Sequence, residues 1–244
     1  MNYIWNWSVF FDEALPGVTY FDWLLSGLKL TVTIGLSAWL IGLVLGGALG
    51  VMRTLPNRLL AGLASAYVEV FRNIPLLVQL FIWYFVAPEL LPGDLGTQIK
   101  AMNPFMQQFV AAVVCLGLYT ASRICEQVRA GIQALPKGQQ MAGLALGFTL
   151  PQTYRYVLLP VALRIIIPPL TSEFMMVFKN SAVASIIGLL ELAAQGRQLV
   201  DYTAQPYESF TAVTVLYLII NMSALYVMRW IETRTRVPGF LGKH

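Results

Sequence analysis

Residues 136–160 read PKGQQMAGLALGFTLPQTYRYVLLP, a polar stretch between two apolar blocks that are each long enough to cross a bilayer. Ala142, Gly143 and Ala145 give its first half small side chains, so a helix built from it has a thin surface that another protein can approach closely. Gly147 can end this helix because glycine adopts backbone angles that are closed to other residues. The stretch therefore predicts a short helix that ends at a glycine.

A second short helix is predicted after Gly147. Pro151 fits its first turn and Pro160 fits its end, because proline lacks the N–H that an interior helical position must donate. Lys137 and Arg155 place one cation on each side of the glycine. We therefore expect two short helices that project from a membrane on the side that carries these cations.

The composition places most of the chain in a bilayer. Of the 244 residues, 57% are hydrophobic and only 11% are charged, whereas a soluble domain has roughly 45–50% apolar residues. The net charge of +4 is small and spread along the chain, so it does not indicate a nucleic-acid partner. Cys115 and Cys125 fall in one apolar block, and we interpret them as buried small residues rather than as a disulfide or a metal pair.

Five apolar blocks reach the roughly 20 residues that a membrane-spanning helix needs. The N-terminal segment, residues 1–20, lacks the basic start of a secretory signal, and residues 232–244 form a basic tail. Between them, residues 21–231 are expected to form one transmembrane domain. Its predicted spans cover residues 21–52, 59–88, 105–133, 161–190 and 210–231.

Several local features of these blocks carry expectations of their own. Pro75 removes a backbone hydrogen bond from the second block, so we expect a kink there. Loops are expected at residues 89–104 and in the segment that carries Arg197, Asp201 and Glu208. Lys29 lies near the outer end of the first span, where its long stem can snorkel to the headgroups.

Glycines recur every fourth residue in the first span, at Gly42, Gly46 and Gly50. This spacing lets another helix approach closely. The partner helix can belong to the same chain or to a second subunit.

The distribution of Lys and Arg predicts the orientation, because their excess marks the cytoplasmic side. The loops on one side carry few of them, Lys100 and Arg197, beside many acidic residues. The polar stretch and the C-terminus are therefore expected inside, with the N-terminus outside. The cations on the inner side are Arg53, Arg58, Lys137, Arg155, Arg234, Arg236 and Lys243.

The 136–160 stretch resembles the EAA loop of ABC-importer permeases, an acidic-Ala-Ala run followed by a Gly and then by I-x-L-P. In that family this loop forms the coupling helices that sit in a groove of a cytosolic ATPase. Val157 takes the Ile place, and Met141 stands where the acidic residue usually lies, so docking by shape is expected here. The alternative is an amphipathic connector on the membrane surface. The predicted coupling residues are Met141, Ala142, Gly143, Gly147, Val157, Leu159 and Pro160.

Three further segments are similar to polar-amino-acid permeases. Residues 72–79 resemble the R-x-x-P-L-L-V-Q segment of that family, and residues 126–132 resemble its E-x-x-R-x-x-I run. Residues 179–182 resemble its K-N-[ST]-S run, with Ala182 in place of the second Ser. In detail, the whole sequence resembles a glutamate/aspartate permease subunit of a Gram-negative inner membrane.

The resemblance implies an all-α membrane protein with the five-span fold of type I importers. It implies the pore-forming subunit of an ATP-driven importer that receives glutamate or aspartate from a periplasmic binding protein and releases it into the cytoplasm. The implied partners are a cytosolic ATPase dimer, a second permease subunit that is identical or related, the binding protein and the bilayer. ATP and Mg²⁺ belong to the ATPase, so this chain is expected to have no cofactor, metal ligand or catalytic residue.

Ionisable residues inside the spans indicate a polar path, because such groups usually face protein or a water-filled cavity. Arg123 and Glu126 are three residues apart on one helix face and can pair with each other, so a tether and a transport role are both open for them. A dicarboxylic substrate favours cations along its path, since an unpaired carboxylate is costly in a low dielectric. The candidate path residues are Arg72, Asn73, Arg123, Glu126, Lys179, Asn180 and Ser181.

Missing motifs exclude several other classes. The only histidine is His244, and neither H-E-x-x-H nor G-x-S-x-G occurs, so an intramembrane enzyme would lack its ligands or nucleophile. No G-x-x-x-x-G-K-[ST] occurs either, so the chain is not the ATPase. Five unequal spans show no repeated halves, which disfavours a secondary transporter. A permease for another polar amino acid and an ATP-independent channel stay open.

Overall fold

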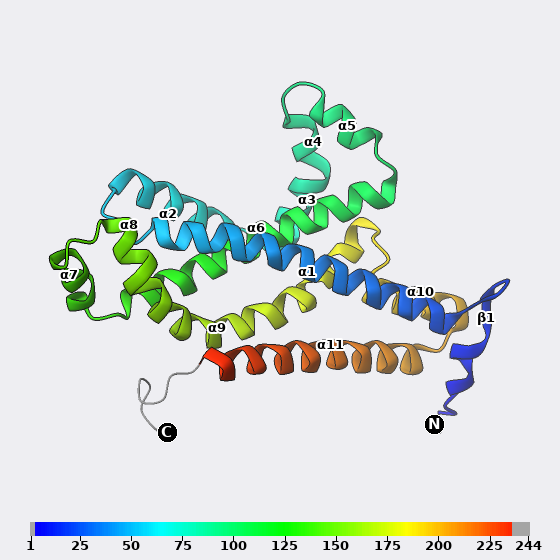
Figure 1. Cartoon of the computed structure of the whole chain (residues 1–244). Helices are drawn as coiled ribbons and strands as arrows, with labels where there is room; N and C mark the ends of the chain where they lie inside the picture. The colour runs from blue at the N-terminus through cyan, green and yellow to red at the C-terminus, as the bar shows by residue number, and fades with distance from the viewer. Residues whose placement is uncertain (1–2, 236–244) are drawn as a thin grey trace. The chain divides into compact units, whose positions relative to one another are not determined.

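The computed structural model describes residues 3–235, which are almost entirely helical (Figure 1). They fall into two compact units. The first unit comprises residues 3–40, 74–117 and 176–222, and the second comprises residues 41–73, 118–175 and 223–235. The long helices contribute residues to both units, because each one runs through a boundary between these ranges.

Four continuous helices in the described part of the chain are long and apolar enough to cross a membrane. Three of them are single α-helices, α1 (Tyr20–Met52), α6 (Pro104–Gln133) and α11 (Pro206–Thr235). The fourth, Leu150–Ile187, is built from α8 (Leu150–Thr153), a π turn (Tyr154–Leu158), α9 (Leu159–Asn180) and a 3₁₀ segment (Ser181–Ile187).

The second predicted span is a broken pair of helices rather than one kinked helix. Arg58–Asn73 forms α2, and Leu76–Phe81 forms α3, which continues through a π turn at Ile82–Val86 into α4 (Ala87–Leu90). Pro75 is extended at ψ 137°, and the residue before a proline is sterically biased away from the helical region. The Gln79 amide donates a hydrogen bond of 2.8 Å to the Ile74 carbonyl that the break leaves without a helical partner. The pair counts as a fifth span only if both halves are taken together.

Both segments predicted as loops contain helices. Leu95–Ala101 forms α5, and the Lys100 ammonium lies 2.9 Å from the Glu89 carboxylate at the end of α4. Leu192–Thr203 forms α10, whose first turn is capped by the Glu191 carboxylate, which accepts hydrogen bonds from two backbone N–H groups. Both loop predictions were wrong, because short polar helices carry little of the apolar signal from which spans are read.

Glu191 is the buried polar centre of the first unit. Its carboxylate caps α10 and also accepts a hydrogen bond of 2.7 Å from the Tyr217 hydroxyl on α11. The Thr31 hydroxyl of α1 lies 3.4 Å from the same carboxylate and accepts a bond from the Leu192 N–H. A buried carboxylate is stable when it is fully hydrogen-bonded, so this group ties three helices together.

The N-terminal segment adds a short hairpin to the helical fold. Glu13–Leu15 (β1) pairs antiparallel with Val18–Thr19 (β2) across a turn in which Gly17 has φ +76°. Ahead of the hairpin, the Tyr3 hydroxyl donates a 2.5 Å hydrogen bond to buried Glu208 in the first turn of α11. This bond raises the pKa of Tyr3 to about 12, so the phenol stays protonated and holds the segment against α11.

The glycines of α1 pack against α6 within the second unit. A Cβ added at Gly46 would lie 2.6 Å from the Ala121 carbonyl oxygen, and one at Gly50 would lie 2.9 Å from the Cys125 carbonyl oxygen. A Cβ at Gly42 would lie 2.9 Å from the Thr120 methyl group. The repeat therefore serves a contact within the chain, which is one of the two alternatives that its spacing left open.

Candidate functional site

The 136–160 stretch forms a helical hairpin. Lys137–Ala145 is α7 and Leu150–Thr153 is α8, drawn in green in Figure 1. Gly147 has φ +85°, and the N–H groups of Gly147 and Phe148 bond back to the carbonyls of Leu144 and Gly143 at 3.0 and 3.1 Å. These two bonds satisfy carbonyls at the helix end and define a Schellman cap. The prediction that the first helix ends at Gly147 is therefore confirmed.

The second half of the hairpin begins with a capping box. The Thr149 N–H and hydroxyl both bond the Gln152 side chain, at 2.8 and 3.0 Å, and Pro151 lies in the first turn. Gly143 is buried against Thr153, whose methyl group would lie 2.9 Å from an added Cβ. This contact lets α7 and α8 pack closely, so Gly143 positions the hairpin instead of facing a partner.

The helix does not end at Pro160, which corrects the prediction for its second half. The π turn at Tyr154–Leu158 leads directly into α9, and Pro160 is the second residue of that helix. Proline has no N–H to donate to the preceding turn, and the wider π turn lies where that bond is missing. Pro160 is exposed, whereas Val157 and Leu159 are half-buried.

Tyr154 anchors the hairpin, although it was not among the residues predicted from the sequence. Its ring is buried, and its hydroxyl donates a 2.8 Å hydrogen bond to the Thr54 carbonyl just after the end of α1. Buried Thr153 and Leu158 flank it. The sequence signal for this role is the tyrosine itself, because a buried tyrosine hydroxyl usually finds a hydrogen-bond partner.

Apolar side chains cover the outside of the hairpin. We call this set the hairpin surface: Met141, Leu144, Leu146 and Phe148, of which Leu146 is 78% and Met141 66% exposed. Contiguous exposed apolar side chains rimmed by polar ones mark interaction sites. Ala142, next to Met141, is also exposed and adds no bulk.

A charged cluster lies near the ends of α1, α2 and α6 in the second unit. The Glu126 carboxylate bonds Arg53 and lies 3.1 Å from Arg129 and 3.7 Å from Arg72. Three guanidinium groups thus share one carboxylate, and the Arg72 side chain is 50% exposed. The cluster carries an excess of positive charge on its open side.

Arg123 does not pair with Glu126, contrary to the pairing that their spacing suggested. Instead, its guanidinium forms two hydrogen bonds, of 2.6 and 3.0 Å, with the buried carboxylate of Glu173 on α9. Glu126 pairs with Arg129 on its own helix, in the order acid before base that α-helices favour. Two N–H groups of the Arg123 guanidinium bond the two carboxylate oxygens of Glu173, and such a bidentate pair is stronger than a contact through one hydrogen bond.

The remaining candidate path residues are dispersed. Asn73 is exposed at the last position of α2, next to Arg72. Lys179, Asn180 and Ser181 belong to the first unit, at the junction of α9 and its 3₁₀ extension. Lys179 is exposed and Asn180 half-buried, while buried Ser181 donates a 2.8 Å bond to the Phe178 carbonyl. Ser181 therefore fixes the helix end and presents no hydroxyl to a solute.

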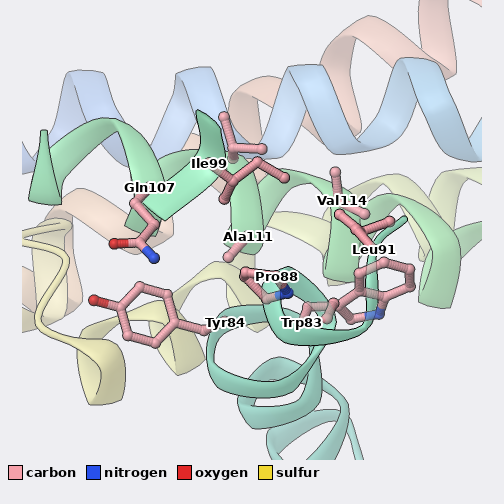
Figure 2. Close-up of a pocket in the computed structure, with 10 residues that line it drawn as sticks. Trp83, Tyr84, Pro88, Leu91, Ile99, Gln107, Ala111 and Val114 are labelled. Atoms are coloured by element: carbon pink, nitrogen blue, oxygen red, sulfur yellow. The ribbon is translucent and has the colours of Figure 1, made fainter. Parts of the chain in front are cut away.

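An apolar cavity of about 200 Å³ lies within the first unit between α4, α5 and α6. Figure 2 shows Trp83 and Pro88 facing Ala111 and Val114 across it, with Tyr84 and Gln107 at one end. Its lining includes no charged side chain. This cavity therefore suits an apolar group and not a charged amino acid.

Residues 7–237 match the model of a protein family described as the binding-protein-dependent transport system inner membrane component. The chain belongs to this family. Members of this permease family are multi-pass inner-membrane components of ABC importers, and ATP hydrolysis is carried by a separate subunit. The chain is therefore a pore-forming subunit and not an enzyme. Importers of this family combine such a permease with an ATPase and a binding protein.

Full-length relatives and solved structures agree with this assignment. The chain is 52% identical over 244 residues to the glutamate/aspartate import permease protein GltJ of Escherichia coli, with 99% of each chain covered. It is 32% identical to the glutamine transport system permease protein GlnP of E. coli, over 89% of this chain and 99% of that one. The crystal structure of an amino acid ABC transporter with histidines has a TM-score of 0.74 and 30% identity, covering 91% of this chain and 99% of the other. The chain thus has the type I importer permease fold.

Proposed function

We propose that this permease carries glutamate and aspartate across the inner membrane. The observation that carries the proposal is the 52% identity with GltJ along the whole of both chains, against 32% with GlnP. The excess cations of the cluster around Glu126 agree with a substrate of net negative charge. Arg72 and Lys179, both exposed, are the proposed contacts along its path.

The hairpin surface is proposed to dock onto a cytosolic ATPase dimer. Its exposed apolar side chains support a partner there, and the Lys and Arg count supports a cytoplasmic hairpin and a periplasmic N-terminus. Met141 offers an apolar contact where similar loops carry a carboxylate. The other proposed partners are a second permease subunit, identical or related, and a periplasmic amino-acid-binding protein.

A short chain of contacts would carry motion from the hairpin into the membrane. Tyr154 bonds Thr54, and the neighbouring residue Arg53 bonds Glu126 on α6. When ATP binding closes the ATPase dimer, a displaced hairpin would pull on the end of α1 and on the charged cluster. Each partner would then favour one of two pore conformations through its differential contacts.

The test is reconstitution in liposomes with the ATPase, the second permease and the binding protein. ATP-dependent uptake of labelled glutamate, with excess glutamate, aspartate, glutamine or arginine as competitors, should show inhibition by the first two only. If glutamine alone competed, the substrate would be another polar amino acid. Glutamate flux without ATP would favour a channel.

A further inference from the structure

A second and larger cavity opens in the first unit, and its mostly apolar wall carries several polar side chains. It has a volume of about 680 Å³, within the roughly 300–1,000 Å³ of small-molecule sites, and lies between α1, α6 and the start of α10. Polar side chains from α1 line one wall, and the rings of Phe105 and Phe109 on α6 line another. Its polar lining residues are Ser26, Lys29, Thr33, Gln108 and Gln195.

Lys29 supplies the only charge among the side chains that line this cavity. It lies nine residues into α1, about 13 Å along a helix that is roughly 50 Å long and so exceeds a hydrocarbon core of about 30 Å. Within residues 3–235, no carboxylate lies within 4.0 Å of its ammonium group. Its neighbours Ser26 and Thr33 are three and four residues away, so the three form one polar stripe on α1. A polar stripe on a spanning helix usually faces protein or a water-filled cavity, which favours a place for Lys29 in this cavity over one among the lipid headgroups.

Gln195, at the start of α10, is the most buried of the polar residues that line the cavity. Its side chain is 7% exposed, and its amide N–H donates a 3.2 Å bond to Ser26, which fixes the plane of the amide. The other end of the amide, Oε1, is buried and has no hydrogen-bond partner in the described part of the chain. Such an orphaned acceptor is costly unless a donor from a ligand or from water completes it.

The backbone makes room for the third polar group. Gly188 has φ +89°, and the Gln108 amide nitrogen would lie only 2.9 Å from a Cβ added there. A residue with a side chain would be strained at this angle and would displace Gln108. Gly188 therefore keeps the Gln108 amide at the wall of the cavity.

From these groups we infer that the cavity binds an acidic amino acid, with Lys29 as the residue that recognises its side-chain carboxylate. The Thr33 hydroxyl donates its proton to the Lys29 carbonyl, which leaves its oxygen free to accept from the α-ammonium group, and the Gln108 amide N–H can donate to a carboxylate oxygen. Phe105 and Phe109 contact the methylene carbons. This inference rests on the proposed function and adds a residue that sets its specificity.

Direct binding tests the site without the binding protein. The assembled importer in lipid nanodiscs, with both permeases and the ATPase but no nucleotide, is titrated with labelled glutamate, glutamine and arginine. Lys29→Met should weaken glutamate binding about ten- to hundredfold, the loss expected for one charged hydrogen bond, and should change glutamine binding less. Lys29→Arg should stay within a few fold of the unmodified protein, and Lys29→Glu should favour arginine over glutamate.

Lys100→Met is the matched control, because Lys100 belongs to the same unit but pairs with Glu89 outside the cavity. It should bind glutamate normally. Unchanged glutamate affinity in Lys29→Met, or no glutamate binding by the unmodified complex, overturns the site. ATP-driven glutamate uptake measured in parallel separates the two proposals: its absence in the unmodified complex overturns the substrate, whereas its presence with normal Lys29→Met affinity overturns the site alone.

Discussion

Arg123 on α6 and Glu173 on α9 form a bidentate pair, with hydrogen bonds of 2.6 and 3.0 Å to a carboxylate that is 6% exposed. Arg123→Met leaves this buried carboxylate without a counter-charge. We expect a loss of about 3 kcal/mol in the free energy of unfolding, at the low end of the range for broken buried pairs because Arg123 is partly exposed. The measurement is thermal or denaturant unfolding of the purified permease in detergent.

A double-mutant cycle tests whether the two side chains act as a pair. It compares Arg123→Met, Glu173→Met and the double variant Arg123→Met/Glu173→Met. Replacing both partners by apolar residues removes the unpaired charge, so the double variant should recover most of the stability. Additive losses would show that the two side chains do not act as a pair. The exposed pair Lys100–Glu89 serves for comparison, and breaking it should cost under about 1 kcal/mol.

The turn of the helical hairpin could be read from the sequence, whereas the run of its second half into α9 and the ion pairs could not. Gly147, Thr149 and Pro151 act within a few residues of one another, so their caps are encoded locally. The partner of Arg123 lies fifty residues away, and its distance depends on how α6 and α9 pack.

The role proposed for Lys29 also depends on residues that are distant in the sequence. Its position in the chain fits snorkelling, and only the side chains that α6 and α10 bring to the cavity indicate a different role. The polar stripe of Ser26, Lys29 and Thr33 was the sequence signal that could have found it.

Gly147 should tolerate asparagine far better than valine. Its φ is +85°, a region that a β-branched residue strongly avoids and that asparagine can adopt. No described atom lies within 4 Å of an added Cβ, so the cost comes from the backbone and not from a clash. Gly147→Val should abolish ATP-driven uptake while membrane insertion continues, and Gly147→Asn should keep most of it. Normal uptake by Gly147→Val would contradict a coupling role for this turn.

The hairpin surface offers two exposed positions that should respond differently to the same charge. Met141 occupies the place of the acidic residue in similar loops, so Met141→Glu should leave the ATPase bound during purification. Leu146, 78% exposed, is expected to be covered by the partner, so Leu146→Glu should release the ATPase. Copurification of the ATPase with a tagged permease measures both variants. Equal retention would argue that the ATPase does not contact Leu146.

Arg72 and Lys179 are predicted to attract an acidic substrate. Replacing either by glutamine keeps a polar side chain and removes the charge, so glutamate uptake should fall several-fold. Binding of the ATPase should not change, because neither residue belongs to the hairpin surface. Initial uptake rates at increasing ionic strength provide the readout, since salt screens an exposed charge such as Arg72. If the loss at low salt equals the loss at high salt, the role of the residue is structural.

Gly46 and Gly47 are adjacent in α1 and should respond oppositely to alanine. An added Cβ at Gly46 would lie 2.6 Å from the Ala121 carbonyl oxygen and 2.9 Å from the Ile124 Cβ, so α1 and α6 would have to separate. Gly46→Ala should therefore cost about 1–3 kcal/mol, as overpacking of a tight contact does. At Gly47 no described atom lies within 4 Å of the added methyl group, and alanine favours the helix by about 0.5–1 kcal/mol. Unfolding of the two variants in detergent checks this, and a loss at Gly47 as large as that at Gly46 would contradict the open space around Gly47.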